Sequence, residues 1–152
     1  MKVIRIIATI LVSVSMAFIV ACSEQKTASL EGNEDIAAVI QKLPEIYDNP
    51  ETAMEIYTDD AILKRQDSTT GYWAEFTGPK AIGEYKKEKG KTKHKISLSI
   101  RSINREADKA QVEYSFIRQG IEGEPFDYEK RCSAEMVKLG QKWKIKMDKV
   151  EY

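Results

Sequence analysis

Three side chains in this sequence have the reactivity that catalysis or metal ligation needs. They are Cys22, which follows an apolar run, Cys132 in the segment DYEKRCSAEMVKL, and His94, the only histidine of the chain. A thiolate is a nucleophile and a metal ligand, and an imidazole exchanges protons near neutral pH. Because the chain has no CxxC or HxxxH spacing, it predicts no metal site. We expect Cys132 to be a buried thiol without a catalytic role.

The segment before Cys22 has the three parts of an export signal. Lys2 and Arg5 precede an uncharged apolar run from Ile6 to Val20, and the small residue Ala21 follows it. This run is shorter than the about 20 apolar residues that a membrane-spanning helix requires. We therefore expect residues 1–21 to be a signal peptide that the cell removes.

The residues Ile-Val-Ala at positions 19–21, followed by Cys22, resemble the lipobox of bacterial lipoproteins. This resemblance implies that the chain is cut before Cys22 and that acyl chains are attached to its thiol and its new amino group. Each buried methylene contributes about 0.8 kcal/mol, so two or three such chains hold a domain at a membrane. An ordinary cleaved signal or an uncleaved anchor are the alternatives. With Cys22 acylated, Cys132 has no partner within the chain for a disulfide.

The lipobox resemblance also implies a location in the cell envelope. Ser23 stands where an aspartate would resemble a signal for retention at the inner membrane. The resemblance therefore favours the periplasmic face of the outer membrane, if the source has two membranes.

Charge and length exclude other classes of function. The chain of 152 residues carries 24 basic and 24 acidic side chains, so it fits one domain plus an appendage. The lysines of residues 86–95 are interrupted by Glu88 and Gly90, as in a solvated helix end. Without a basic patch we expect no nucleic-acid partner, and no motif indicates a cofactor.

The mature chain divides into a lipidated cysteine with a flexible tether, residues 22–33, and a folded domain, residues 34–152. Asn33 is a candidate cap for a helix whose apolar stripe runs from Ile36 to Tyr47, and Pro44 should bend or shorten that helix. We expect a second short helix over residues 50–57, capped by Asn49, and a third over residues 79–90. Short strands are expected over residues 61–66 and 71–76.

From residue 93 onwards apolar and polar side chains alternate, as in strands. The four alternating runs cover residues 93–103, 110–117, 126–139 and 142–152. In the last run we expect Trp143, Ile145 and Met147 to face the core, while Lys146 and Asp148 face water. Helices followed by such a meander predict an α+β domain, in which a curved antiparallel sheet forms a cone around three helices.

This order of elements resembles the nuclear transport factor 2-like superfamily, which includes SnoaL-like cyclases and ketosteroid isomerases. The phrases IYTDDAIL (56–63) and TGPKAIGEY (77–85) strengthen the resemblance, which covers residues 34–152. We expect Asp59 and Asp60 to bind backbone amides where the second helix meets the first strand. The general base of the isomerases falls at Arg65 and their second acid at Ala134, so the resemblance does not extend to isomerase activity.

A cone of this kind has an open end that a ligand could fill. The candidate ligand-binding side chains are aromatic, flexible or able to exchange a proton, namely Tyr47, Trp73, His94, Tyr114 and Met136. The competing interpretation is that they only close the core, which we expect of Tyr57 and Trp143. We favour a domain that binds a small apolar ligand or a protein partner without catalysis. The alternative is a SnoaL-like lyase or isomerase in which His94 is the general acid and base.

The outward face of the predicted sheet is a candidate homodimer interface. Its side chains are of mixed charge, which suits solvent or a wet interface equally. They are Arg101, Glu113, Ser115, Glu129, Arg131, Ser133, Glu135, Lys144 and Lys146.

Overall fold

The helical part of the domain comes first in the chain, and Pro44 divides it as predicted. The computed structural model describes residues 30–67, 69–90, 95–119 and 128–151. Helix α1 (Glu34–Gln41) ends before the 3₁₀ helix η1 (Leu43–Tyr47), which has Pro44 in its first turn. Asn33 occupies the N-cap position of α1, but its side chain makes no capping hydrogen bond. Helices α2 (Thr52–Ile56) and α3 (Pro79–Gly90) follow.

Strand β1 begins earlier than the sequence suggested. It covers Tyr57–Gln66, so Asp59 and Asp60 lie inside the strand with exposed side chains and not in a turn. Tyr57 already has extended backbone angles (φ −99°, ψ 153°), as suits an aromatic residue followed by a β-branched one. The Asp60 carboxylate accepts a hydrogen bond from the Thr58 hydroxyl at 2.8 Å. The expectation that Asp59 and Asp60 lie at a helix end was therefore wrong, although the Asp60 carboxylate also accepts a hydrogen bond from its own backbone amide.

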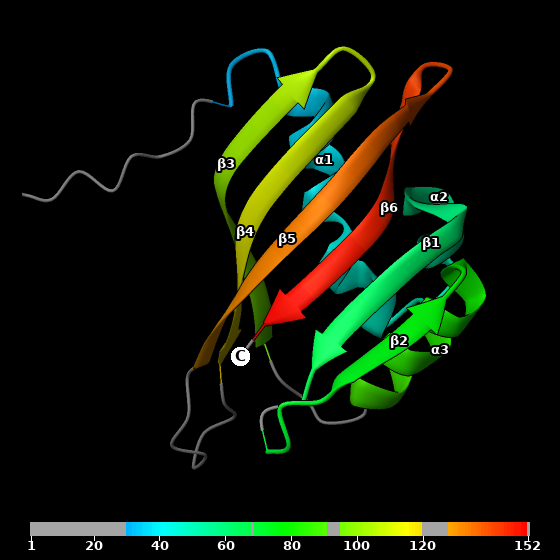
Figure 1. Ribbon diagram of the computed structural model, residues 1–152, viewed down its shortest axis with the longest axis vertical. Helices are drawn as coiled ribbons and strands as arrows, with labels where there is room; N and C mark the ends of the chain where they lie inside the picture. Colours follow the sequence, from blue (N-terminus) through cyan, green and yellow to red (C-terminus); the bar gives the residue numbers. More distant parts are fainter. Residues whose placement is uncertain (1–29, 68, 91–94, 120–127, 152) are drawn as a thin grey trace, which may run out of the picture.

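Six strands form one curved sheet in the order β2-β1-β6-β5-β4-β3, and the helices cover one of its faces (Figure 1). The remaining strands are β2 (Trp73–Thr77), β3 (Lys95–Glu106), β4 (Lys109–Gln119), β5 (Tyr128–Leu139) and β6 (Lys142–Glu151). Strands β3 to β6 are an antiparallel meander, as predicted. Strand β1 pairs with β6 in parallel, so the sheet is mixed. The α+β class and the curved, cone-like sheet around three helices are confirmed.

A bulge in β6 turns one acidic side chain from solvent into the core. Glu135 of β5 pairs with Met147, but Met136 pairs with Ile145, which leaves Lys146 as an extra residue. Trp143 and Ile145 are buried as predicted, but beyond Lys146 the alternation is reversed. Asp148 is 0% exposed. The expectation that Asp148 faces water was wrong, because simple alternation holds only while the strand pairs residue by residue.

The core lies between the concave face of the sheet and the helices. Its largest buried side chains come from every layer, and Asp148 lies among them. Helix α3 approaches the backbone of Pro50 closely at Gly83, where a Cβ atom would lie 2.6 Å from the Pro50 carbonyl oxygen. Within the described residues, none of the helices has the length and apolar character to cross a membrane.

A candidate ligand cavity inside the cone

Asp148 is the centre of a buried polar cluster that joins four elements. Its Oδ2 atom accepts a hydrogen bond from the Tyr57 hydroxyl of β1, and its Oδ1 atom accepts one from the Tyr114 hydroxyl of β4, each at 2.6 Å. Lys86 Nζ of α3 lies 3.4 Å from Asp148 Oδ2. These four residues, Tyr57, Lys86, Tyr114 and Asp148, form what we call the Asp148 cluster. It ties α3 to the inner face of the sheet.

The two phenols of the Asp148 cluster are donors at any physiological pH. Burial raises the pKa of Tyr57 well above its usual value, and the negative charge of Asp148 raises it further. The pKa of Tyr114 is raised for the same two reasons. Both hydroxyls therefore keep their protons and hold the Asp148 carboxylate in place. The Lys86 ammonium also lies 5.8 Å from the Tyr47 ring centre and 5.9 Å from that of Tyr57, within the range of cation–π attraction.

Beside this cluster lies a cavity of about 30 Å³, which has room for about two water molecules. We call it the cone cavity. Its lining consists of aromatic, aliphatic and basic side chains, namely Tyr47, Leu63, Arg65, Tyr85, Lys86, Tyr114, Phe116, Lys130 and Val150. Among these described residues there is no carboxylate and no imidazole.

Lys130 is a basic residue of the cone cavity whose pKa is strongly perturbed. It points inward from β5 and is 6% exposed. Burial lowers the pKa of Lys130 to about 7, and the positive charge of Arg65 is the next contribution. Arg118 of β4 and Lys89 of α3 act in the same direction. A buried amine surrounded by other cations therefore changes its charge near neutral pH.

Aromatic rings form the walls of the cone cavity. The rings of Tyr47 and Phe116 lie 5.8 Å apart, and those of Phe76 and Tyr85 are stacked at 4.0 Å. Arg65 Nη1 donates a hydrogen bond to the Tyr85 hydroxyl, and its guanidinium carbon lies 5.7 Å from that ring centre. Arg65 therefore lies at the cavity.

The structure brings together two of the five residues that the sequence proposed for a ligand site. Tyr47 and Tyr114 line the cone cavity. Met136 is fully buried in the core, and Trp73 is 42% exposed on β2, where Lys149 Nζ lies 5.0 Å from its ring centre. His94 lies outside the described residues.

Two residues expected to serve the core alone also make polar contacts. Tyr57 belongs to the Asp148 cluster, and Trp143 Nε1 donates a hydrogen bond to Asp35 Oδ2 at 2.8 Å. Cys132 is buried, as expected. Burial raises the pKa of its thiol to about 12, with the charge of Asp148 contributing, so the thiol stays protonated at neutral pH.

Sequence reasoning missed Asp148, Lys86 and Lys130 as site residues. For Asp148 a signal was present, since Val150 is apolar and shares its face, whereas Trp143 and Ile145 belong to the opposite phase. Such a change of phase between Ile145 and Val150 indicates a bulge. Nothing local distinguishes Lys86 and Lys130 from the many exposed lysines.

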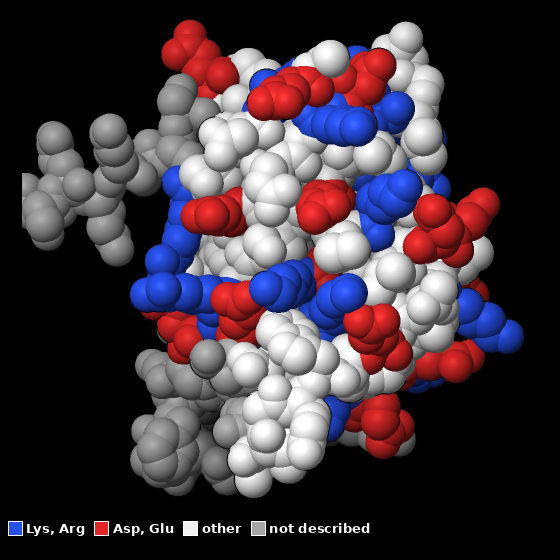
Figure 2. All heavy atoms as spheres, in the orientation of Figure 1, with Lys and Arg blue, Asp and Glu red and all other residues white. Residues whose placement is uncertain are grey.

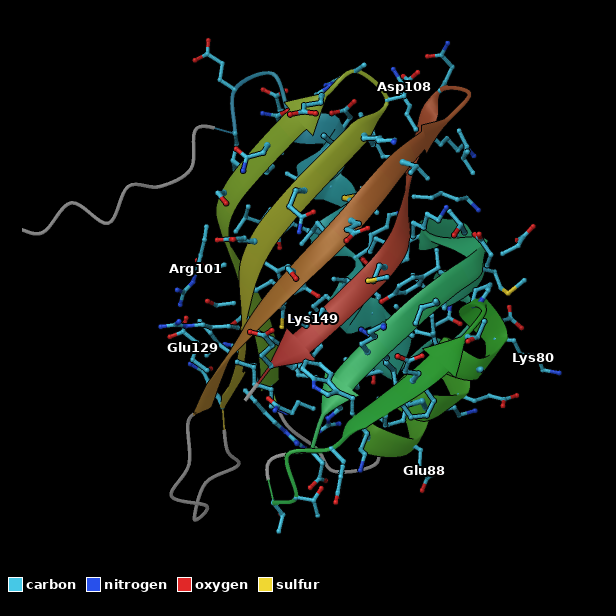
Figure 3. The ribbon with its side chains drawn as sticks, in the orientation of Figure 1. Lys80, Glu88, Arg101, Asp108, Glu129 and Lys149 are labelled. Atoms are coloured by element: carbon cyan, nitrogen blue, oxygen red, sulfur yellow. The ribbon has the colours of Figure 1, made fainter. Side chains whose placement is uncertain are left out.

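The outer face of the sheet presents acidic and basic side chains intermixed with uncharged ones (Figure 2). Arg101 donates hydrogen bonds to Ser115 Oγ, at 2.6 Å, and to Glu129, toward which it points in Figure 3. Ser115, one of the nine residues of the candidate homodimer interface, is thereby buried.

Among the described residues, no group of three His, Cys, Asp or Glu side chains is placed to hold a metal ion.

Comparison with known proteins identifies the fold through solved structures. No protein-family model and no curated protein matches the chain. A protein of unknown function from Pseudomonas putida KT2440, described as NTF2-like, superposes with a TM-score of 0.63 at 12% identity, over 82% of this chain and 88% of that one. Another such protein, from Shewanella oneidensis MR-1, gives 0.61 at 12% identity, over 78% and 98%. The fold is nuclear transport factor 2-like.

A third nuclear transport factor 2-like neighbour carries a ligand. It is a hypothetical protein with a ketosteroid isomerase-like fold from Catenulispora acidiphila, in complex with trimethylamine. Its TM-score is 0.55 at 18% identity, over 75% of this chain and 83% of that one. At such identities these comparisons show the fold alone. They assign no role to the residues of the cone cavity.

Proposed function

We propose that this protein is a lipid-anchored protein of the cell envelope whose nuclear transport factor 2-like domain binds a small molecule at the cone cavity, with only a group about the size of two water molecules entering the space of about 30 Å³. The observation that carries the proposal is the combination of aromatic walls with buried basic groups around one small cavity. The trimethylamine complex of the Catenulispora acidiphila protein supports it at the level of the fold, because that neighbour accepts a small ligand.

We propose binding without turnover. The only carboxylate of the Asp148 cluster accepts hydrogen bonds from Tyr57 and Tyr114, lies beside Lys86, and is fully buried behind the cavity lining. A proton-transfer enzyme needs an acid or base within reach of its substrate. The competing hypothesis, a SnoaL-like lyase or isomerase, depends on His94. His94→Ala would abolish turnover of the bound molecule in that case, and we expect it to leave both the ligand and its fate unchanged.

The membrane anchor rests on the residues Ile-Val-Ala-Cys at positions 19–22. We expect the protein to fractionate with membranes, and Cys22→Ala to release it or to leave it unprocessed, because the thiol that accepts the lipid is then missing. Ser23→Ala is the matched control, since it changes the neighbouring residue and leaves that thiol. Equal membrane association of a Cys22→Ala variant whose signal peptide has been removed would contradict acylation.

Mass spectrometry of the full chain, extracted from membranes in a mild detergent, tests both parts of the proposal. The denatured mass should equal residues 22–152 plus the acyl chains. Under native conditions we expect additional mass that is lost on denaturation, which would reveal the ligand and also the number of subunits. A native mass without any such addition, in preparations that retain the fold, would count against a tightly bound ligand.

A further inference from the structure

We propose that the hairpin of β5 and β6 docks on the membrane that holds the lipid anchor, with Leu139 among the headgroups and Lys138 and Lys142 against anionic phospholipids. This inference rests on the anchoring part of the proposed function and does not depend on the cone cavity. It is carried by the place where the described chain enters the fold, the short length of chain before that place, and the composition of the hairpin.

The described chain enters the fold in a turn that is attached to the end of β3. Asn33 N donates a hydrogen bond to the Leu30 carbonyl oxygen at 2.8 Å, and Gly32 within this turn has a φ of 79°. Arg105 of β3 donates a hydrogen bond from Nη1 to the Gly32 carbonyl oxygen at 3.2 Å and lies 3.6 Å from Asp35 Oδ1. The point of entry is therefore fixed at the end of the sheet where β3 ends.

The turn between β5 and β6 lies at this same end of the molecule. In Figure 1 it stands at the top with the turn between β3 and β4, whereas the turn between β1 and β2 lies at the bottom. The Lys138 backbone N–H donates a hydrogen bond to the Asp108 carbonyl oxygen at 2.8 Å, which joins the two upper turns. The β5–β6 hairpin thus projects from the end at which the chain enters.

The length of chain before Leu30 limits which end of the domain can face the membrane. Leu30 lies eight residues after Cys22, and eight residues span at most about 28 Å. Strand β3, which runs from the entry end toward the opposite end, has 12 residues and extends for about 37 Å (Figure 1). The far end is therefore out of reach of a membrane that holds a lipid on Cys22.

This limit excludes the end of the domain that carries exposed aromatic side chains. Tyr72 and Trp73, beside the β1–β2 turn, are of the type that is common at membrane interfaces. By composition alone they would be the first candidates for membrane contact. Because they lie at the far end, the contact is left to the entry end, where Leu139 is 55% exposed.

A tight turn holds Leu139 at the tip of the β5–β6 hairpin. Leu139 pairs with Lys142, so Gly140 and Gln141 alone form the turn, and Gly140 supplies the positive φ of 63° that such a turn requires. Lys138 precedes Leu139 in the chain. The tip therefore presents one exposed apolar side chain with a lysine on either side of it.

The β5–β6 hairpin is basic over its whole outer half. Residues 136–147 include four lysines and no aspartate or glutamate. Lys146 has an acidic neighbour on another strand, Asp60, at 3.9 Å. Lys138 and Lys142, nearest the tip, make no ion pair with any acidic side chain that the structure describes. Their charges are available to an external anion.

The acidic side chains of the entry end belong to other segments. Glu106 and Asp108 lie in or next to the β3–β4 turn, and Glu31 and Glu34 belong to the start of the described chain. The hairpin is therefore the part of this end that an anionic headgroup surface attracts, over about the 10 Å that salt screening allows. An apolar side chain beside such lysines is stable at the boundary between headgroups and acyl chains.

The test measures how close labelled positions lie to vesicles of phosphatidylethanolamine and phosphatidylglycerol that carry the full, lipidated chain. The Cys22 thiol holds the lipid and the Cys132 thiol is buried and protonated, so an introduced cysteine takes the fluorescent label. Three exposed positions receive it in separate variants. Gln141→Cys labels the β5–β6 turn, Thr69→Cys the β1–β2 turn, and Glu113→Cys the outer face of the sheet.

We expect lipids with a nitroxide on the headgroup to quench the label at position 141 severalfold more than the labels at positions 69 and 113. With the label at position 141, Leu139→Ser should remove most of the quenching, because the apolar contact is lost. The matched control is Tyr72→Ser, which removes an exposed apolar side chain from the far end and should change nothing.

The role of the lysines is tested by charge. Replacing phosphatidylglycerol with neutral phosphatidylcholine should reduce the quenching at position 141 severalfold, and so should the double change Lys138→Gln and Lys142→Gln. The control is Lys80→Gln with Lys87→Gln, which alters net charge equally at two exposed positions of α3. Quenching that is the same in neutral vesicles would overturn the contact with anionic phospholipids.

The outcomes separate this inference from the anchor on which it rests. Equal quenching at positions 141 and 69, or stronger quenching at position 113, would overturn docking through the hairpin and leave the anchor in place. Leu139→Ser should still fractionate with membranes, because Cys22 keeps its lipid. A full chain that does not associate with vesicles at all would remove the anchor and this inference together.

Discussion

Lys86 and Lys130 are two lysines buried to nearly the same degree, in opposite electrostatic surroundings. Lys86 is 4% exposed and lies 3.4 Å from the carboxylate of Asp148. Lys130 is 6% exposed, burial lowers its pKa to about 7, and the cations Arg65, Arg118 and Lys89 lower it further. The degree of burial alone therefore does not determine whether the charge of a lysine stabilises the fold.

The difference separates a lysine that is paired with a carboxylate from one whose charged form is destabilised by its surroundings. Lys86 belongs to a cluster in which two phenol hydroxyls donate hydrogen bonds to Asp148 and an ammonium group lies beside it. Removing any member therefore leaves a charge or a polar group in the core without its partner. Burial and the neighbouring cations destabilise the ammonium form of Lys130. The two lysines should consequently respond to mutation in opposite directions.

The largest effect is expected for Asp148→Ala. This change leaves the Lys86 ammonium and two phenol hydroxyls buried without their acceptor, and we expect it to lower the free energy of unfolding by about 3–5 kcal/mol. Urea unfolding followed by circular dichroism measures it. Asp59→Ala removes an exposed carboxylate from the sheet and should change stability by less than about 0.5 kcal/mol. Equal effects of the two changes would refute the structural role of the cluster.

A smaller loss is expected for Tyr114→Phe. The ring remains, but Asp148 Oδ1 loses its donor, and we expect a cost of about 1–3 kcal/mol. The same urea titration measures it. The matched control is Tyr72→Phe, since Tyr72 is 77% exposed and removing its hydroxyl should change the free energy of unfolding little. A neutral outcome at Tyr114 would mean that its hydrogen bond contributes nothing to holding Asp148.

Lys130→Met should stabilise the protein, by about 1 kcal/mol or more at pH 6. The pKa of Lys130 is about 7 in the fold and near its ordinary 10.5 in the unfolded chain, so between these values the unfolded chain binds more protons. Wild-type stability should therefore rise with pH across that window, and the variant should lose this rise. Thermal unfolding at pH 6, 8 and 10 checks it, with Lys87→Met as control. Destabilisation at pH 6 would place Lys130 with Lys86 as a structural residue.

Much of the fold could be predicted because its signals are local. Helical spacing, Pro44 and the period-two runs depend on residues close in the chain, and each gave an element of the right type. The boundary at Tyr57 was missed because Asp59 and Asp60 have low strand propensity, whereas Tyr57 pairs with Ile145 of β6. Tyr47 and Tyr114 were found at the cone cavity because aromatic residues on inward positions are visible in the pattern.

The sequence alone determined an α+β domain with a cone-like sheet, and it supports the prediction that Cys22 is lipidated. Only the tertiary structure decided that Asp148 faces the core, because the bulge at Lys146 arises from pairing with β5. Likewise only the fold makes Lys130 differ from other lysines, since its neighbours Arg65, Lys89 and Arg118 come from β1, α3 and β4. Local patterns specify where a side chain can point, whereas a charge state depends on groups that are distant in sequence and near in space.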